Sequence, residues 1–172
     1  MRLGFPVHGC DPRTDAVHAT RHRISDLVGE EEAETCVRVA TLDDMQYPDA
    51  SFDWVIAYHA EILATTTEEL HALLSEARRM LKPGGWVYLT FPAAVSDIDE
   101  HERTSGDGAP INTPAEASVS SGKGGGTFSM NTLKEQQQAA NLAVASAPEI
   151  VDEHGRLRLR AIYRRVEPET PR

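Results

Sequence analysis

The fold of this chain is decided by residues 52–91, which read FDWVIAYHAEILATTTEELHALLSEARRMLKPGGWVYLTF. Residues 52–58 form a nearly continuous apolar run, which predicts a strand that is buried on both faces. Residues 86–91 form a second run of this kind. The segment between the two runs has the periodicity of a helix. A strand, a helix and a strand in this order favour a parallel pair in a sheet that carries helices on both faces.

The helix between these strands has sequence signals at both ends. A capping box can form between Thr65 and Glu68, or between Thr66 and Glu69. The sequence Pro-Gly-Gly at 83–85 ends the helix. One apolar stripe, which we expect to face the core, consists of Leu70, Leu73, Leu74, Ala77 and Leu81.

The segments before this stretch predict another strand, helix and strand. Residues 7–10 form a short apolar strand, and Asp11 followed by Pro12 is typical of a helix start, with Asp11 as the N-cap. Residues 36–40 form the next strand. The expected apolar face of the intervening helix consists of Val17, Ile24, Leu27 and Val28.

The periodic patterns stop at residue 92 and resume at residue 128. Residues 93–127 are rich in glycine, serine and proline, and we expect a flexible loop there that contacts the substrate. Its glycine-rich part, 122–126, lacks the spacing of a phosphate-binding loop and is interpreted as a hinge. Despite this loop, the length of 172 residues favours a single domain, 1–172.

The last part of the chain predicts a helix followed by a hairpin. A capping box from Thr132 to Glu135 opens a helix that we expect to run to about Val144. Residues 149–151 and 157–166 then form an antiparallel hairpin. Arginine alternates with apolar residues in the second of these segments, which favours a strand with one solvated face over an acidic-ligand site.

Composition and charge restrict the function. The formal net charge is -10 and the pI is about 5.1. An acidic surface disfavours nucleic-acid backbones and anionic membranes as partners. The sequence has no apolar run long enough for a transmembrane helix and no signal peptide, so we expect a cytoplasmic protein. We expect Cys10 and Cys36 to be buried thiols rather than a disulfide.

Two motifs carry a family resemblance. Residues 47–53, YPDASFD, lead into the strand at 52–58, and residues 79–85, RMLKPGG, precede the strand at 86–91. Together they resemble the class I S-adenosylmethionine-dependent methyltransferases of type 11. The resemblance implies an α/β, Rossmann-like three-layer sandwich with a mostly parallel sheet in the order 3-2-1-4-5-7-6 and a C-terminal antiparallel hairpin. It implies S-adenosylmethionine as cofactor and methyl transfer to a small-molecule substrate.

The resemblance also implies which residues bind the cofactor. Asp11 matches the acid that accepts hydrogen bonds from the two ribose hydroxyls. Thr41 and Leu42 fall where the family carries an adenine-contacting acid, which Asp43 or Asp44 could replace. Tyr58 lies at the end of its strand and faces the expected methyl-transfer site.

Other polar residues near these positions have two interpretations each. His59 could act as a base toward a substrate hydroxyl, although an ordinary strand-end residue is the preferred interpretation. His18 and His22 have the i, i+4 spacing of a metal-binding pair, but an exposed helix face is preferred and we expect no metal site.

The sequence departs from the family at its beginning. The family's first strand and its acid-x-Gly-x-Gly loop would precede residue 7, and Met1 to Pro6 do not contain them. Without that strand, the strands on either side of it have open edges. We therefore expect the chain alone to bind S-adenosylmethionine poorly and to self-associate. The alternatives are a non-catalytic remnant or split half that binds a partner chain through these edges, and a nicotinamide-dinucleotide-binding domain.

Overall fold

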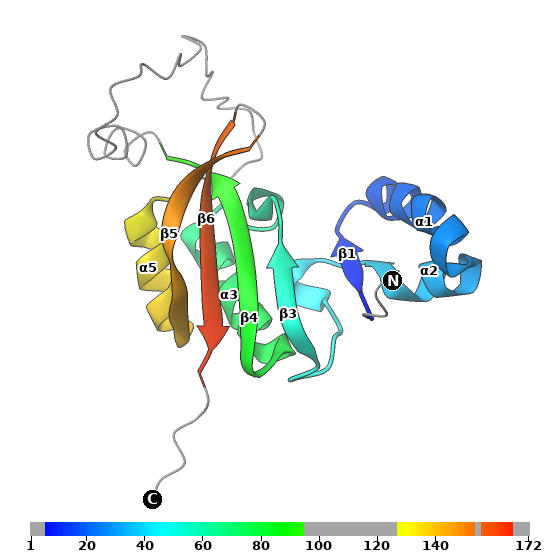
Figure 1. Cartoon of the computed structure of the whole chain (residues 1–172), viewed down its shortest axis with the longest axis horizontal. Coiled ribbons are helices and arrows are strands. Elements are labelled where there is room, and N and C mark those ends of the chain that lie inside the picture. Colours follow the sequence, from blue (N-terminus) through cyan, green and yellow to red (C-terminus); the bar gives the residue numbers. More distant parts are fainter. Residues whose placement is uncertain (1–5, 95–126, 154–155, 167–172) are drawn as a thin grey trace, which may run out of the picture. The chain divides into compact units, whose positions relative to one another are not determined.

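The computed structural model describes residues 6–94, 127–153 and 156–166. The expected loop at 93–127 and its glycine-rich hinge lie almost entirely outside these residues, so mobility there stays a prediction. The chain divides into two compact units, Met1–Tyr47 and Pro48–Arg172, which are described separately (Figure 1). That the whole chain forms one domain also stays a prediction.

The first unit contains a two-stranded parallel sheet and two helices. Strand β1 (Gly9–Asp11) pairs with β2 (Val37–Val39), and helices α1 (Thr14–Val28) and α2 (Glu30–Cys36) connect them. A short 3₁₀ helix, η1 (Leu42–Asp44), follows.

Helix α2 has no counterpart in the sequence prediction, which placed Cys36 in a strand. Gly29, with φ of 90°, separates the two helices: its N–H donates to Ser25 at the end of α1, and its carbonyl accepts from Ala33 in α2. The small core consists of Val17, Cys36 and Val37, with Ile24 packed against it. Leu27, expected on the buried face, is 70% exposed.

The second unit is a four-stranded mixed sheet with the order β3-β4-β6-β5. Strands β3 (Phe52–Ala57) and β4 (Leu81–Pro92) are parallel, whereas β6 (Arg156–Arg165) is antiparallel to both β4 and β5 (Leu142–Glu153). The expected hairpin is therefore confirmed. This order and the β1-β2 pair match the 4-5-7-6 and 3-2 portions of the order that the resemblance implies.

Helix α3 (Thr67–Met80) begins and packs as the sequence indicates. Thr66 is the N-cap, and both hydrogen bonds of its capping box with Glu69 are present. The predicted stripe is buried, with Leu70 and Leu74 fully inaccessible. Leu81 is also buried, but it is the first residue of β4 rather than the last of the helix.

The two glycines of the RMLKPGG motif lie in the first part of β4, because α3 already ends at Met80. Gly84 has φ of 78°, a left-handed conformation that side chains disfavour. A Cβ on Gly85 would lie 2.9 Å from the carbonyl oxygen of Lys82 and 3.1 Å from that of Asp53. The close approach of this part of β4 to β3 therefore requires Gly85.

Helix α5 (Met130–Ala139) begins earlier than predicted, because the cap is Ser129 and not Thr132. The Ser129 hydroxyl accepts from the Thr132 N–H at 3.2 Å. The helix also ends earlier: Asn141, with φ of 52°, turns the chain into β5, which contains Val144. The capping box predicted at Thr132 lies three residues after the observed cap, so both ends of the predicted helix are too late in the sequence.

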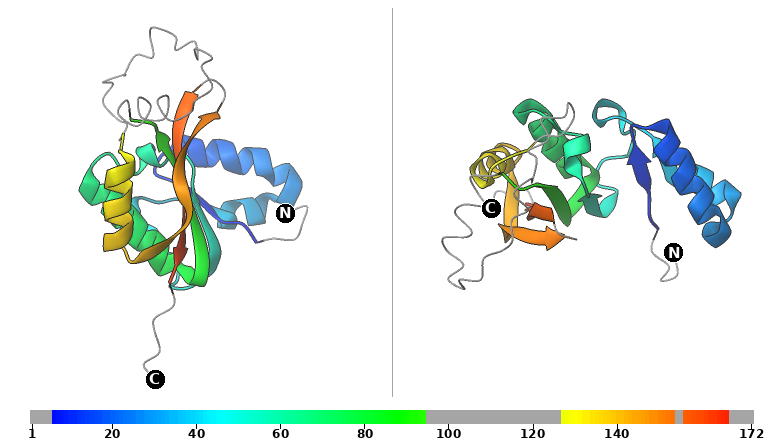
Figure 2. Two further views of the ribbon diagram at one scale, coloured as in Figure 1. Left: turned by 60° about the vertical axis from the view of Figure 1, so that its left-hand side comes forward. Right: turned by 90° about the horizontal axis from the view of Figure 1, so that it is seen from above.

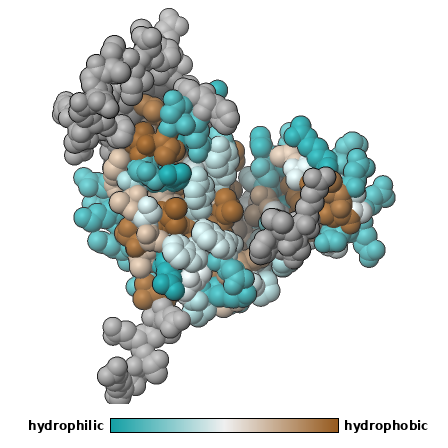
Figure 3. Space-filling model, in the orientation of Figure 1, coloured by the Kyte–Doolittle hydropathy of each residue, from teal (hydrophilic) through white to brown (hydrophobic). Residues whose placement is uncertain are grey.

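One face of this sheet forms the core of the unit. Helices α3 and α5 lie on that side, as Figure 2 shows. On the opposite face Trp54 and Ile56 are 53% and 67% exposed, and Trp54 stacks on Trp86. In Figure 3 hydrophobic and neutral residues lie among charged ones there. The core face of the sheet carries Val87, Leu89, Phe91, Leu159, Ala161 and Tyr163.

Burial of β3 on both faces was therefore a wrong prediction. Strand β3 is at an edge of the sheet, and within the described residues no helix of this unit covers its second face. An apolar run signals burial in the complete fold and does not say which element provides the cover.

Candidate functional site

A group of polar side chains gathers where β3 and β4 end. Parallel strands bring their C-terminal ends to one edge of a sheet, which is where ligands bind in open α/β folds. Here β6 and β5 add residues to that edge from the hairpin. The group, called the polar cluster below, consists of Tyr58, His59, Glu61, Thr90, Glu153 and Arg158.

His59 is fixed by an unusual backbone conformation directly after β3. Its φ and ψ of 58° and 48° are left-handed, which is uncommon for a residue other than glycine. The turn starts the 3₁₀ helix η2 (Ala60–Ile62). The His59 N–H donates to the hydroxyl of Thr90, a buried residue of β4, at 3.0 Å. The end of β3, the turn into η2 and the bond to β4 thus fix the backbone position of His59.

Glu61 links this turn to strand β6. Its carboxylate contacts His59 Nδ1 at 2.9 Å and accepts two hydrogen bonds from Arg158, at 2.8 and 3.2 Å. The side chains of Glu61 and Arg158 are 13% and 6% exposed. Burial raises the pKa of Glu61, but the bonds from Arg158 and His59 outweigh burial, so the pKa lies below its ordinary value.

Tyr58 joins the cluster from the exposed side. Its hydroxyl donates to Glu153 Oε2 at 2.8 Å, and the Arg158 guanidinium lies 6.0 Å from its ring centroid. Arg158 Nε is also 3.7 Å from Glu153. The bond to Glu153 raises the pKa of Tyr58, which keeps the phenol protonated. Tyr58 therefore belongs to a network, although its expected contact with a cofactor stays a prediction.

Arg158 is buried, although the sequence predicts that the arginine-bearing face of β6 is solvated. The side chain is buried because three strand ends and η2 surround it, and two carboxylates neutralise its charge. Sequence reasoning missed Glu61, Thr90 and Glu153 as well. The contacts that assemble the cluster, Thr90 with His59, Glu153 with Tyr58 and Glu61 with Arg158, join residues 31, 95 and 97 positions apart, so no local pattern could identify it. The contacts of Glu61 with His59 and of Glu153 with Arg158 are local.

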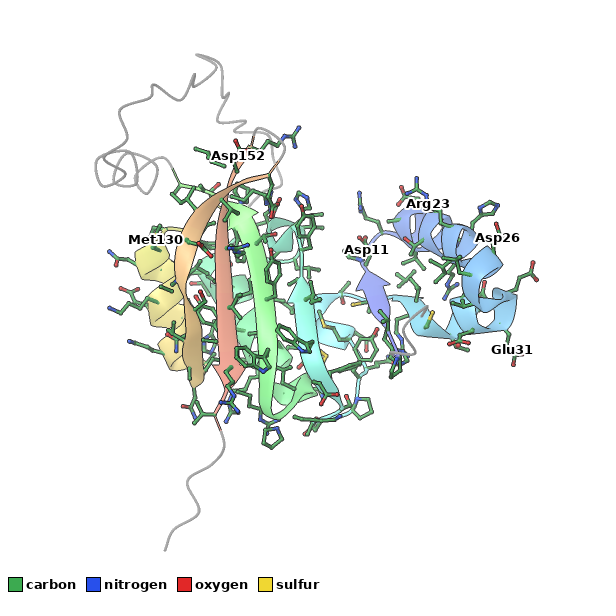
Figure 4. All side chains as sticks on the ribbon, viewed as in Figure 1. Asp11, Arg23, Asp26, Glu31, Met130 and Asp152 are labelled. Carbon is green, nitrogen blue, oxygen red and sulfur yellow. The ribbon has the colours of Figure 1, made fainter. Side chains whose placement is uncertain are left out.

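In the first unit, Asp11 lies at the end of β1 (Figure 4). It is not the N-cap of α1, because the helix begins at Thr14 and its N-cap position is Arg13. Asp11 Oδ1 instead accepts from the Arg13 N–H at 2.8 Å, and both carboxylate oxygens contact the Arg13 guanidinium. Burial raises the pKa of Asp11, but these bonds outweigh it and lower the pKa. The helix therefore begins two residues later than the sequence predicts.

This carboxylate fits the role that the family gives it. A carboxylate has about four acceptor positions, and Arg13 uses three. The side chain is 29% exposed. Asp11 therefore keeps about one acceptor position, enough for one hydroxyl group, and would have to release a bond to Arg13 to accept from both hydroxyls of a ribose.

The two residues at the expected adenine position differ in exposure. Thr41 is exposed and precedes η1 without capping it through its side chain, whereas Leu42 is half-buried. Asp44 is exposed and bonded to Gln46, and the side chain of Asp43 lies outside the described part. Which of these contacts a cofactor stays a prediction.

The remaining sequence candidates are dispersed. His18 and His22 are both exposed on α1. Within residues 6–94, 127–153 and 156–166, no three His, Cys, Asp or Glu side chains are grouped to hold a metal ion. Over the same residues, no helix is long and apolar enough to cross a membrane. Cys10 and Cys36 are free thiols, of which only Cys36 is fully buried, and burial raises the pKa of Cys10.

The fold and its strand-end site define an α/β protein of the Rossmann-like class. The family model for a methyltransferase domain of type 11 matches residues 1–89, more than half of the chain. The chain therefore belongs to this methyltransferase family, and the resemblance seen in the sequence is confirmed. No curated protein sequence matches the chain.

Solved structures show the same fold. A SAM-dependent methyltransferase from Methanosarcina mazei superimposes with a TM-score of 0.62 at 16% identity, covering 95% of this chain and 84% of that one. Geranyl diphosphate C-methyltransferase from Streptomyces coelicolor A3(2), in complex with Mg²⁺, geranyl diphosphate and S-adenosyl-L-homocysteine, gives 0.60 at 15%, covering 96% and 66%. Magnesium protoporphyrin IX methyltransferase from Synechocystis PCC 6803, with bound SAH, gives 0.63 at 13%, covering 95% and 66%.

Proposed function

We propose that this chain functions in the transfer of a methyl group from S-adenosylmethionine to a small-molecule acceptor. The observation that carries this proposal is the family match over residues 1–89, which includes β1, β3 and most of β4. The cofactor, when bound, supplies a methyl group on a positively charged sulfur. The protein then has to align donor and acceptor, which is the main source of rate in such a transfer.

The residues of each unit have separate roles in this proposal. Asp11 accepts hydrogen bonds from the ribose hydroxyls, and Thr41 and Leu42 lie beside the adenine. In the second unit Tyr58 borders the reacting end, and the polar cluster orients the acceptor. The net charge of -10 supports a small acceptor over a nucleic acid.

Binding of the cofactor tests the proposal most directly. Because we expect the chain alone to bind S-adenosylmethionine poorly, titration calorimetry on the full chain would compare the wild type with Asp11→Ala at high cofactor concentration. One lost charge-assisted hydrogen bond contributes about 1.5–3 kcal/mol, so we expect the Kd to rise by about tenfold or more. Asp15→Ala, which removes an acid from the first turn of α1, is the matched control. Equal affinity of the Asp11 variant and the wild type would remove Asp11 from the site.

Catalysis needs its own measurement. Transfer of tritium from methyl-labelled S-adenosylmethionine to a panel of small alcohols, phenols and amines would identify the acceptor class. Labelled product with any of them supports the proposal. Cofactor binding without any product would favour the second candidate.

The second candidate is a partner-binding chain, and the exposed residues of β3 favour it. We propose that a strand of a partner chain, or of a second copy, pairs with the open edge of β3 beside Trp54 and Ile56. Light scattering should then show association that Ile56→Lys reduces. Leu27→Lys, on α1 and equally exposed, should not change it. A monodisperse monomer at all concentrations would contradict self-association through this edge.

A further inference from the structure

We propose that His59 and Glu61 form a catalytic base pair, in which His59 Nε2 removes the proton from an acidic hydroxyl group of the acceptor. Arg158 is the positioning residue that holds Glu61. This inference rests on the proposed function and names its acceptor class, an oxygen nucleophile of the phenol or enol type.

The geometry determines which imidazole nitrogen is available. Arg158 holds the Glu61 carboxylate with two hydrogen bonds from a buried guanidinium, which favours the ionised form. An ionised carboxylate only accepts, so His59 Nδ1, 2.9 Å away, must carry the proton. Nε2 of the neutral ring is then an acceptor, and no described residue forms a hydrogen bond with it. The side chain is 39% exposed.

The backbone of His59 supports a functional role. A left-handed conformation is unfavourable at a residue other than glycine, and such residues concentrate in active sites. Here the conformation brings Glu61, two residues later, within hydrogen-bonding distance of the ring. The bond to Thr90 holds the turn from β4.

Within the described part of the chain, the polar groups around His59 belong to Tyr58, Glu61, Thr90, Glu153 and Arg158. The Tyr58 ring packs edge-on at 4.5 Å between centroids, and its hydroxyl is directed to Glu153. Glu61 and Glu153 together carry one more negative charge than the Arg158 guanidinium, which contacts both carboxylates. The His59 N–H bond to Thr90 is uncharged.

The methyl transfer and the proton transfer together conserve all atoms and electrons. The acceptor oxygen forms a bond to the methyl carbon, and the carbon–sulfur bond breaks with its electron pair on sulfur, giving S-adenosylhomocysteine. The hydroxyl proton moves to His59 Nε2. A base is useful for a phenol-type hydroxyl, whose pKa is about 10, whereas a carboxylate acceptor is already ionised and needs none.

The first test requires no substrate. In the full chain labelled with ¹⁵N-histidine, NMR should show the neutral His59 ring with its proton on Nδ1, assigned by its loss in His59→Asn. In Glu61→Gln, where Arg158 binds the amide oxygen and the NH2 group faces Nδ1, this tautomer should no longer dominate. Glu68→Gln, on the exposed start of α3, should leave it unchanged. A proton on Nε2 in the wild type would overturn the proposal.

A second test measures the nucleophilicity of Nε2. Diethylpyrocarbonate acylates the unprotonated imidazole, and peptide mass spectrometry reports each histidine separately. Glu61→Gln should slow modification of His59 by about tenfold or more, the range for loss of a charge-assisted hydrogen bond. The exposed His18 and His22 are internal controls. An unchanged His59 rate in a folded variant would contradict the pair.

Methyl transfer separates this inference from the proposed function. With catechol as the probe, His59→Asn should lower kcat by about 100-fold to 10,000-fold. The loss should be smallest at high pH, where the phenol ionises by itself. Full activity of His59→Asn would overturn the base and leave the methyltransferase proposal intact. No transfer by the wild type to any acceptor would overturn the proposed function and the acceptor class, while the tautomer and acylation results would still decide whether the pair exists.

Discussion

The chain has a carboxylate–arginine pair at the end of β1 and another at the end of β3, and the two pairs differ in burial and in sequence separation. Each strand ends beside a carboxylate that meets an arginine, Asp11 with Arg13 and Glu61 with Arg158. The first pair is local, two residues apart and partly exposed. The second is buried and joins positions 97 residues apart. A local pair can form in almost any conformation of the chain, whereas the second exists only when the sheet of the second unit is complete.

The largest expected difference between the two pairs is in stability. Arg158→Met would leave Glu61 buried without a cation, and breaking such a pair costs about 3–5 kcal/mol of unfolding free energy. Urea unfolding should show a much lower midpoint. Arg13→Met is the control, and its midpoint should be nearly unchanged because the Asp11 pair is exposed. Equal shifts of the urea midpoint in the two variants would mean that the buried pair stabilises the fold no more than the exposed pair does.

Hydrogen exchange should show the same contrast across whole elements. Strands β4 and β6 have a neighbour on each side, whereas β1 and β2 form a two-stranded sheet over a small core. Two-stranded sheets are only marginally stable. We expect amides of β4 to exchange at least about 100-fold more slowly than those of β1, a difference of ~2.7 kcal/mol in opening free energy. Equal protection would show that the two units unfold as one.

The pH dependence of stability should also depend on Glu61. Its folded pKa lies below the ordinary value of 4.5, so ionised Glu61 stabilises the folded state at neutral pH. That contribution is present above pH 4.5 and is lost as the pH falls through the folded pKa. Unfolding of wild type and Glu61→Gln, compared from pH 7 downward, should show a difference that narrows below pH 4.5. A constant difference would mean that charge is not involved.

The same contrast explains what the sequence could predict. The capping box of Thr66 and Glu69 and the stripe of α3 depend on neighbours within a few residues, and the structure confirms them. The glycines do not end the helix: α3 ends at Met80, and Gly84 and Gly85 lie within β4. The polar cluster depends on strand register, which a sequence does not specify when the hairpin's length is unknown. β5 is in fact 12 residues long, far longer than the predicted segment.

The wrong predictions for Asp11, Leu27 and Trp54 come from local sequence patterns that fit more than one structural context. Asp11 was placed at the helix cap because an acid before proline satisfies that pattern, but the chain needs Pro12 and Arg13 to turn from β1 into α1. Leu27 and Trp54 were expected to be buried because periodicity reports an apolar face and not the element that covers it.

Asp11→Asn gives the smallest expected effect on stability and the finest test of the local pair. The Asn side chain keeps an oxygen that can accept from the Arg13 N–H, so the turn after β1 should persist and the urea midpoint should barely move. The substitution replaces the second oxygen with an amide group, which donates and cannot accept from a hydroxyl. If Asp11 binds ribose, calorimetry with S-adenosylmethionine should show weaker binding by this variant although its fold is intact. A lower midpoint with unchanged affinity would mean the reverse, that the carboxylate serves the turn and not the cofactor.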